Sequence, residues 1–388
     1  MPLAPILGAL TLALTDYSTA QLHSVPASHD ALDLQTTGAA VLTLGDQNSA
    51  LSLRYSPSLL FVDVLHEDQV ALLHSVSLGY VWSRKRLSLT LKETATFGRQ
   101  SYLAFGNVGV AAPPNAGASA APAPAYLPRE QVVYYDSFTT AAGVGYALSR
   151  RWSTLDSVAY VVSGGIGSSE AFIPRSHGPN GLFTLTFAAT RHDTLTTSLS
   201  EAYLVVPSLG SRFLTSTLME TWGHALGKRT QTTLAIGVSE LHSRANAGAQ
   251  FTDSLLASSL AGLTHTKPLS HDATLGFSVT VGLATPYNQV IGVVQQQVYE
   301  YATSTLHVGH LTTGVYLTSS ESLPQSSPNA TRLFGAGTQT TYLITKVVTV
   351  SAGAAWSTQI LPAAAGGDIP SQWSVFAGLG LAAPPIAL

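Results

Sequence analysis

The chain has no cysteine, few charged residues and no long hydrophobic run. The absence of cysteine excludes disulfide frameworks, thiol catalysis and thiolate zinc sites. Only 10% of the 388 residues are charged, whereas about 25% is usual for a soluble domain. The longest nearly apolar run, residues 3–14, is too short for a membrane-spanning helix, which needs about 20 residues. A closed β-barrel also satisfies every backbone hydrogen bond in a bilayer, and its strands need only about 9 to 11 residues.

Charge is balanced as well as scarce. The 18 Lys and Arg residues and 21 Asp and Glu residues give a net charge of −3, which provides no basic field for binding nucleic acid. No Lys or Arg precedes the apolar run at residues 3–14, so a complete secretory signal peptide is not recognisable. We therefore expect the numbering to begin at a mature or trimmed end.

Short turns, many of them basic, alternate with longer loops along the chain. The short set comprises Ser83–Arg86, Ser149–Arg151, Arg191–Asp193, Gly227–Arg229, Lys267–Ser270, His307–His310 and Thr345–Lys346. The longer set comprises residues 98–131, 164–180, 206–211, 242–251, 284–289, 319–332 and 358–371. Outer-membrane barrels have this asymmetry, with short periplasmic turns and longer extracellular loops. The basic turns are therefore expected on the periplasmic side.

Between the turns, apolar and polar residues alternate. In Leu87–Lys92 the leucines occupy one parity and polar residues the other, and the same period appears in residues 51–55, 183–187 and 373–375. Such a strand presents one face to lipid and the other to water. The polar parity gives the candidates for lining a lumen: Ser52, Arg54, Ser88, Thr90, Lys92, Thr184 and Thr186.

Large aromatic residues lie near the ends of several expected strands. Tyr80 and Trp82 share the parity of Val76 and Leu78 and end at a basic turn, as an aromatic girdle at a membrane surface does. The candidates for this girdle are Tyr80, Trp82, Trp152, Trp222 and Trp356.

Counting the segments between turns gives the architecture. Seventeen strands run from residues 36–44 to residues 372–383, and the alternation of Leu10, Leu12 and Leu14 supplies one more. The sequence therefore predicts an all-β fold, a single transmembrane antiparallel β-barrel over residues 1–388 with about 18 strands, or 16 as the alternative. A barrel of this size has a lumen wider than wall side chains can fill.

Two segments fall outside this pattern. Residues 111–128 are rich in proline and alanine, which excludes a regular strand or helix, and they form either an external loop or a constriction loop. Residues 15–35 carry Asp16, Asp30 and Asp33 among polar neighbours. They are expected to form an early loop, a periplasmic extension or a small plug.

Four glutamates follow an apolar residue by two positions, and so share its lipid-facing parity: Glu93, Glu201, Glu220 and Glu240. A carboxylate in the middle of a bilayer is costly. Because each glutamate was expected to precede an external loop, the simpler interpretation places all four on an acidic outer rim. The alternative is that β-bulges turn them inward as a carboxylate ring that selects cations.

Motifs for chemistry are sparse. No Gly-x-Ser-x-Gly sequence occurs in a strand-to-helix setting. His307 and His310 are the one close histidine pair, and two imidazoles do not make a metal site. The sequence therefore predicts no catalytic residues, no metal site and no cofactor.

Residues 51–61 and 87–98, together with the hairpin rhythm over nearly the whole length, carry a resemblance to a known class. The chain resembles the large, poorly characterised outer-membrane β-barrels of Gram-negative bacteria, some of which are implicated in polysaccharide secretion. The resemblance implies an outer-membrane location, contact with outer-membrane lipid and a periplasmic export partner. The chain departs from the usual aromatic ending of such barrels in residues 383–388.

The expected function is a porin-like conduit for solutes, because few wall charges suit neutral or weakly selected cargo. Polysaccharide export is a specialised form of this function. Inward aromatic residues that form a sugar-stacking track, or a periplasmic partner that co-purifies, would favour it. The alternative is a plugged barrel that serves as a structural anchor or surface receptor. An enzyme is the least expected, since it requires a Ser/His or carboxylate pair at the rim.

Overall fold

The computed structural model describes residues 9–24, 30–46, 48–66, 69–102, 131–171, 173–244, 246–285, 287–288, 293–294, 296–323, 332–360 and 369–387. These residues are mostly β-strand. A 3-10 helix, η1 (Gly167–Ala171), also occurs. No helix in this described part of the chain reaches the length and hydropathy of a membrane span.

Eighteen long strands form one antiparallel sheet. The first nine are β1 (Ala9–Ser24), β2 (Asp30–Gly45), β3 (Ser49–Val62), β4 (Gln69–Arg84), β5 (Leu87–Tyr102), β6 (Gln131–Ala147), β7 (Trp152–Gly165), β8 (Ser176–Ala188) and β9 (Asp193–Val206). The others are β10 (Ser211–Ala225), β11 (Thr230–Arg244), β12 (Thr252–Ser270), β13 (Ala273–Ala284), β16 (Gln297–Val308), β17 (Leu311–Ser322), β18 (Arg332–Leu343), β19 (Val348–Ile360) and β20 (Ile369–Ala382). Three short strands are β14 (Tyr287–Asn288), β15 (Val293–Val294) and β21 (Ile386–Ala387).

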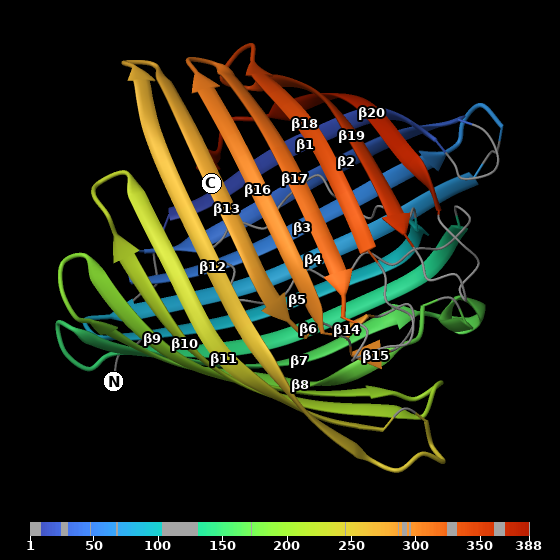
Figure 1. Ribbon diagram of the computed structural model, residues 1–388. Coiled ribbons are helices and arrows are strands. Elements are labelled where there is room, and N and C mark those ends of the chain that lie inside the picture. The colour runs from blue at the N-terminus through green and yellow to red at the C-terminus, as the bar shows by residue number, and fades with distance from the viewer. Residues whose placement is uncertain are drawn as a thin grey trace, which may run out of the picture.

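The sheet closes on itself. Each long strand pairs with the next along the chain, and β1 pairs with β20, where Ala20 lies opposite Ala377. The short strand β21 extends this seam, with Ile386 opposite Leu12. Figure 1 shows the resulting barrel, with β12, β13 and β16–β18 crossing in front of β1–β6. Closure leaves no free sheet edge in the wall. A sheet that spans a membrane needs such closure, because unpaired backbone groups cannot be hydrated there.

The register assigns the two faces of the wall, because directly paired residues share a face. Leu53 lies opposite Leu78, and these side chains are 43% and 41% exposed. One ladder runs from Val144 through Asp156 and Phe183 to Leu199. This parity holds most of the exposed leucines, valines and aromatics of the long strands and is the outer, lipid-facing side. The opposite parity is rich in Ser, Thr and Gly and faces the lumen.

The buried hydrophobic core is small, as a wall one residue thick requires. Its cluster of Val206, Phe213 and Leu241 lies on the inward parity, at the end of the barrel with the longer connections. Because most apolar side chains point outward, the barrel depends on lipid rather than on an interior core for burial of apolar surface.

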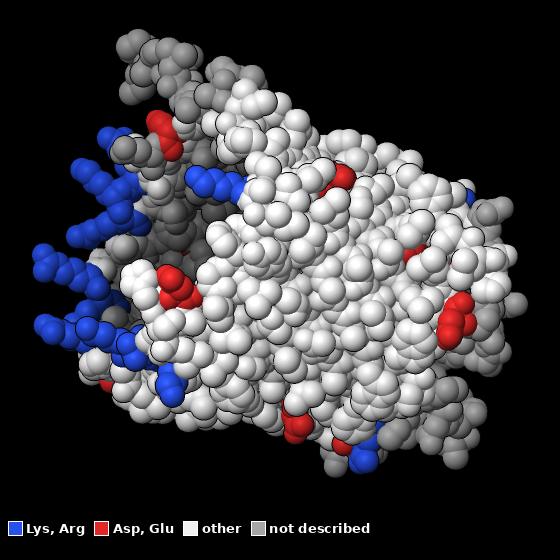
Figure 2. All heavy atoms as spheres, turned by 90° about the horizontal axis from the view of Figure 1, so that it is seen from above, with Lys and Arg blue, Asp and Glu red and all other residues white. Residues whose placement is uncertain are grey.

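The two ends of the barrel differ in charge. Short turns join β4 to β5, β6 to β7 and their counterparts at one end, and the longer connections lie at the other end. Ten of the 18 Lys and Arg residues lie on or within four residues of the short turns, and we call this end the basic rim. Figure 2 shows the blue side chains gathered around a hollow at that end. Its residues are Arg84, Lys85, Arg86, Arg150, Arg151, Arg191, Lys228, Arg229, Lys267 and Lys346.

The predicted barrel is confirmed, with 18 strands rather than the alternative of 16, and the leucine alternation near the N-terminus is part of β1. The interpretation of residues 15–35 is wrong. Most of this segment lies in β1 and β2, which pair over their full length from Ala9 opposite Gly45 to Ser24 opposite Asp30. Asp16 and Ser18 share the outward parity with Ala20 and Leu22, so cross-strand pairing rather than a clear local alternation makes this segment a strand. The loop expected at residues 111–128 lies outside the described residues.

Candidate transport lumen

The seven residues predicted to line a lumen all lie on the inward parity. Ser52 and Lys92 both lie opposite Gly79, from the strands on either side of β4. Thr184 lies opposite Leu155 of β7 and Ser198 of β9. Arg54, Ser88, Thr90 and Thr186 have the same parity in their strands. Their participation in transport stays a prediction.

Part of the inward face is lined by hydroxyl groups that fold over glycines. Ser88 Oγ donates to the carbonyl of Gly145 at 3.4 Å, and a Cβ placed on Gly145 would lie 2.5 Å from that hydroxyl. The same arrangement joins Thr90 to Gly143 at 3.5 Å. The members of this hydroxyl arc, on β3, β5 and β9, are Ser52, Ser88, Thr90 and Thr194.

Across the barrel, aromatic rings take the place of these hydroxyls. Tyr316 of β17 lies directly opposite Gly337, where an added Cβ would be 2.3 Å from the Tyr316 Oη atom. Phe376 and Gly353 form an equivalent pair, with an added Cβ at 2.4 Å from the ring. Each ring therefore lies against the wall, in the space that glycine leaves. The members of this aromatic arc, on β1, β16, β17 and β20, are Tyr17, Tyr299, Tyr301, Tyr316 and Phe376. Tyr301 belongs to the arc by its inward parity and lies opposite Thr280 rather than a glycine.

One further pair repeats the arrangement. Tyr299 lies opposite Gly282, where an added Cβ would be 2.5 Å from the ring. Tyr17 lies opposite Gly380, where an added Cβ would be 2.4 Å from the Thr349 hydroxyl and 3.3 Å from the Tyr17 ring. Tyr17 Oη also bonds Ser351 Oγ at 2.6 Å. The sequence analysis missed the aromatic arc. Extending the alternation test to residues 297–308 would have shown two tyrosines on the polar parity of one strand.

Exposed charge on the inward face is positive. Arg54 and Lys92 are exposed cations at inward positions of β3 and β5. Asp33 is the acidic residue at an inward strand position in the described strands, and it is only 3% exposed. One of its carboxylate oxygens accepts the backbone N–H of Asp63 at 2.9 Å. The water-accessible wall therefore carries cations without neighbouring acids.

The interpretation of the four glutamates needs correction. The register keeps Glu93, Glu201, Glu220 and Glu240 on the outward parity, so the inward carboxylate ring is wrong. A shared outer rim is also wrong, because their heights differ. Glu220 lies in a strand that runs toward a short turn, five positions before Ala225, whereas Glu240 lies four positions before Arg244 at the opposite end. No β-bulge interrupts these strands, so sequence parity fixes the face.

Threonines on neighbouring strands form hydrogen bonds with some of the acidic side chains on the outward face. Thr197 Oγ1 lies 2.8 and 3.0 Å from the two carboxylate oxygens of Glu220. Thr140 Oγ1 donates to Glu93 at 3.2 Å, and Thr36 Oγ1 donates to Asp16 at 3.2 Å. Figure 2 shows acidic side chains scattered over the outer wall. Hydrogen bonds of this kind lower the cost of a carboxyl group at a lipid-facing position.

The aromatic candidates lie on the outward face near both ends of the barrel. Tyr80 and Trp82 lie close to the basic rim at the end of β4. Trp152 stacks on Phe187 there, with ring centroids 4.4 Å apart. Trp356 lies near the other end of β19, directly opposite Trp373. Their role at the membrane surface stays a prediction.

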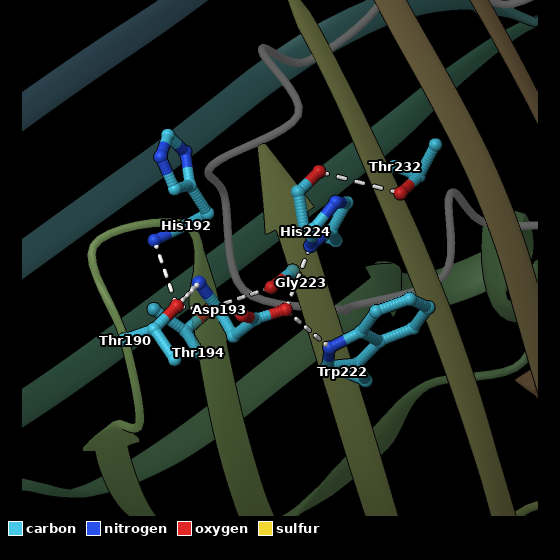
Figure 3. Close-up of polar contacts among 8 residues, drawn as sticks. All are labelled: Thr190, His192, Asp193, Thr194, Trp222, Gly223, His224 and Thr232. Carbon is cyan, nitrogen blue, oxygen red and sulfur yellow. Dashed lines mark hydrogen bonds and ion pairs between the residues drawn. The ribbon is translucent and has the colours of Figure 1, made fainter. Parts of the chain in front are cut away.

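Trp222 belongs to a polar cluster at the basic rim (Figure 3). Its Nε1–H donates to Asp193 Oδ1 at 3.1 Å, and His224 Nδ1 lies 2.7 Å from the same oxygen. Thr190 Oγ1 donates to the other carboxylate oxygen at 2.6 Å and accepts the backbone N–H of His192. The cluster joins the β8–β9 turn to β10. Because these partners satisfy the Asp193 carboxylate, the cluster has the geometry of a structural contact that holds the turn against β10.

The turn between β2 and β3 has a similar carboxylate cap. Asp46 Oδ1 accepts the backbone N–H groups of Asn48 at 2.7 Å and Ser49 at 2.8 Å. These bonds favour the ionised form and hold the pKa of Asp46 below its usual 3.8. The cap therefore stabilises the turn at neutral pH.

No group of three or more His, Asp or Glu side chains placed to hold a metal ion occurs among the described residues. His307, one of the close histidine pair, has its Nδ1 3.0 Å from Thr312 Oγ1 across the turn between β16 and β17. The His307 side chain is therefore engaged in a contact across this turn.

Residues 15–286 match the EpsX exopolysaccharide export family, a stretch that spans more than two thirds of the chain. The chain belongs to the EpsX family. A comparison with curated proteins gives no match. Among solved structures, this EpsX-family barrel is similar to OccK9 (OpdG) of Pseudomonas aeruginosa, with 8% identity and a TM-score of 0.50 over 96% of this chain and 98% of that one.

It is also similar to the FrpB iron transporter of Neisseria meningitidis (F3-3 variant), with 9% identity and a TM-score of 0.51 over 91% of this chain and 62% of that one. At these identities the likeness concerns the fold. Together with the apolar outer face and the aromatic residues at both ends, the findings identify the EpsX-family chain as a porin-like β-barrel of the bacterial outer membrane.

Proposed function

We propose that this barrel is the outer-membrane conduit through which an exported exopolysaccharide leaves the cell. The observation that carries the proposal is the inward wall of an 18-strand barrel, which is rich in Ser, Thr and Gly and has an aromatic arc. Barrels of about this strand number enclose an aqueous channel when no segment fills them. Hydroxyls and aromatic faces suit a hydrated sugar polymer, and the family assignment supports the same cargo.

A conduit needs no bond-making chemistry, so the proposal includes no enzymatic step. The basic rim is the surface that would meet a periplasmic export partner, because the short turns of outer-membrane barrels face the periplasm. Its cations greatly outnumber the acidic residues on the short turns, which are Asp46, Asp193 and Asp272. An acidic surface on the partner would complement this rim.

The absence of native cysteine permits a direct test of transport. Ser77→Cys places a thiol on the inward face of β4, between Arg54 and Thr94 in the register, whereas Leu78→Cys places one on the lipid face. A polyethylene glycol maleimide added to cells should label Ser77→Cys and stop the release of exopolysaccharide. The Leu78→Cys control should continue to release it.

A strain in which the gene is deleted sets the baseline for the amount of surface polysaccharide. Both cysteine variants are expressed in that strain. Continued release after complete labelling at Ser77→Cys would contradict the proposal. So would normal surface polysaccharide in the deletion strain.

A further inference from the structure

We propose that the cargo is an acidic polysaccharide, whose sugar rings stack on the aromatic arc while Arg54 and Lys92 on the opposite wall attract its carboxylates into the lumen. This inference rests on the proposed function and names the substrate class of the same lumen. It follows from the orientation of the rings, their spacing and the placement of charge.

Tyr316 and Tyr299 of the aromatic arc present their ring faces, rather than their edges, to the lumen. The ring of Tyr316 occupies the space that a Cβ on Gly337 would need, at 2.3 to 2.5 Å, and Tyr299 does the same at Gly282. A ring that lies over a glycine backbone has one face covered by the wall and the other exposed. The negative face of an aromatic ring attracts the C–H groups on the flat side of a sugar.

Three rings are spaced for contact with successive parts of one chain. Tyr299 and Tyr301 lie two positions apart on β16, which separates them by about 6.6 Å along the strand. Tyr316 of β17 lies opposite Thr303 of β16, so it is a diagonal neighbour of Tyr301 at about 7 to 8 Å. The three tyrosines thus form an oblique row along the wall, and the other arc members continue the aromatic surface on β20 and β1.

The two cations lie across the lumen from this row. Arg54, Lys92 and Tyr316 each lie five positions from the basic-rim end of their strands, at Ser49, Leu87 and Leu311. They are therefore at a similar height, roughly 12 Å inside the rim. In the closed strand order, β3–β5 and β16–β17 occupy opposite sides, and Figure 1 shows them behind and in front.

Charge along the path has one sign. Arg54 and Lys92 come from alternate strands, about 10 Å apart across the sheet. The inward acid Asp33 is buried, and the basic rim surrounds the adjoining mouth. A polyanion would meet attractive charge at the mouth and then inside, where the low-dielectric wall concentrates the field. A neutral glucan would use the aromatic row alone.

The test measures blockade of single channels in planar bilayers by oligogalacturonate, a carboxylated sugar oligomer, and by a neutral dextran of similar length. Wild type should show longer blockades with oligogalacturonate. Tyr301→Ala combined with Tyr316→Ala should shorten the blockades by both sugars, roughly fivefold. Arg54→Gln combined with Lys92→Gln should shorten only those by oligogalacturonate, roughly threefold at low salt. Thr264→Ala, at an inward position of β12 outside both sets and outside the predicted lumen-lining residues, is the matched control.

Equal blockade of wild type and both double variants by oligogalacturonate would overturn the proposal, and a conducting channel would leave the conduit function intact. Failure of the conduit has a different signature, a folded barrel with no conductance. In that case, calorimetric binding of oligogalacturonate to the detergent-solubilised full chain decides the question. Tight binding that both double variants weaken supports the acidic-sugar site, and absence of binding overturns it.

Discussion

The hydroxyl arc and the aromatic arc are built by the same rule and produce different surfaces. In both, a glycine on one strand leaves space for the residue directly opposite. Ser88 occupies the space at Gly145, whereas Tyr316 occupies the space at Gly337. In the hydroxyl arc the side chain bonds the glycine carbonyl, as Ser88 does at 3.4 Å. At Gly282, Gly337 and Gly353 of the aromatic arc, contact with a ring takes the place of this bond.

The residue that lies opposite a wall glycine decides which surface the wall presents at that point. A glycine alone weakens a strand, because it adds backbone entropy and packs poorly. A cross-strand ring that covers it restores the contact, and this device also fixes register in β-sheets. One arc therefore remains thin and hydrophilic while the other gains a layer of rings, although both draw on the same Ser, Thr and Gly background.

The largest effect should come from adding one methyl group to a glycine of the aromatic arc. Gly337→Ala places a Cβ within 2.5 Å of the Tyr316 ring, so the ring must leave the wall, and we expect a loss of about 1 kcal/mol in the free energy of unfolding. Conductance should fall as the ring enters the lumen.

Gly79→Ala is the matched change, because its Cβ would meet only the Ser52 hydroxyl, at 3.0 Å. It should leave stability and conductance nearly unchanged. Urea unfolding in lipid vesicles and single-channel recording measure both variants, and equal effects would remove the distinction between the arcs.

Changes on the outer wall sharpen the comparison, because they leave both arcs untouched. Glu201→Leu should stabilise the barrel in vesicles by about 1 kcal/mol, since no hydrogen bond to Glu201 occurs among the described residues and lipid is a poor solvent for its carboxyl group. Glu220→Leu should increase stability by less, because it also removes the 2.8 Å hydrogen bond from the Thr197 hydroxyl. A larger gain at Glu220 would contradict this assignment of partners.

Removing the two cations on the wall opposite the aromatic arc should change the ion selectivity of the channel without changing the pore size. Arg54→Gln combined with Lys92→Gln should reduce the anion preference of the channel roughly twofold at low salt, and the difference should vanish at high salt. Reversal potentials in a salt gradient measure this preference. A change in total conductance comparable to that of Gly337→Ala would indicate a structural effect instead.

The smallest effect concerns the turn that begins the hydroxyl arc. The pKa of Asp46 is held below its usual 3.8 by the backbone N–H groups of Asn48 and Ser49. Its contribution to stability is thus present above the usual pKa and is lost as the pH falls through the lowered one. Asp46→Asn should make unfolding slightly less sensitive to acid, and an unchanged pH profile would show that this cap contributes nothing.

Sequence alternation predicted the fold well, because parity decides the face of every strand. Leu87–Lys92 already shows the two faces, and the basic turns mark the ends of the hairpins. The error at residues 15–35 arose because weak alternation in polar strands resembles a loop. In β1 the apolar parity contains Asp16 and Ser18, so tertiary pairing rather than local pattern makes the strand.

The site was less predictable. Ser52 and Thr90 could be placed on the inward face from parity alone. The aromatic arc could not, because it depends on cross-strand register: Tyr316 and Gly337 are far apart in sequence until β17 and β18 pair. The heights of the glutamates depend in the same way on strand direction. Glu220 precedes a short turn because β10 runs toward the basic rim.

The most direct test of the central claim, an open conduit, is the single-channel conductance of the purified full chain in planar bilayers. The account predicts a large, steady and weakly selective conductance, because an 18-strand barrel encloses a wide lumen, and in the described strands its exposed inward charges are Arg54 and Lys92. A correctly folded barrel that inserts and remains electrically silent would contradict it.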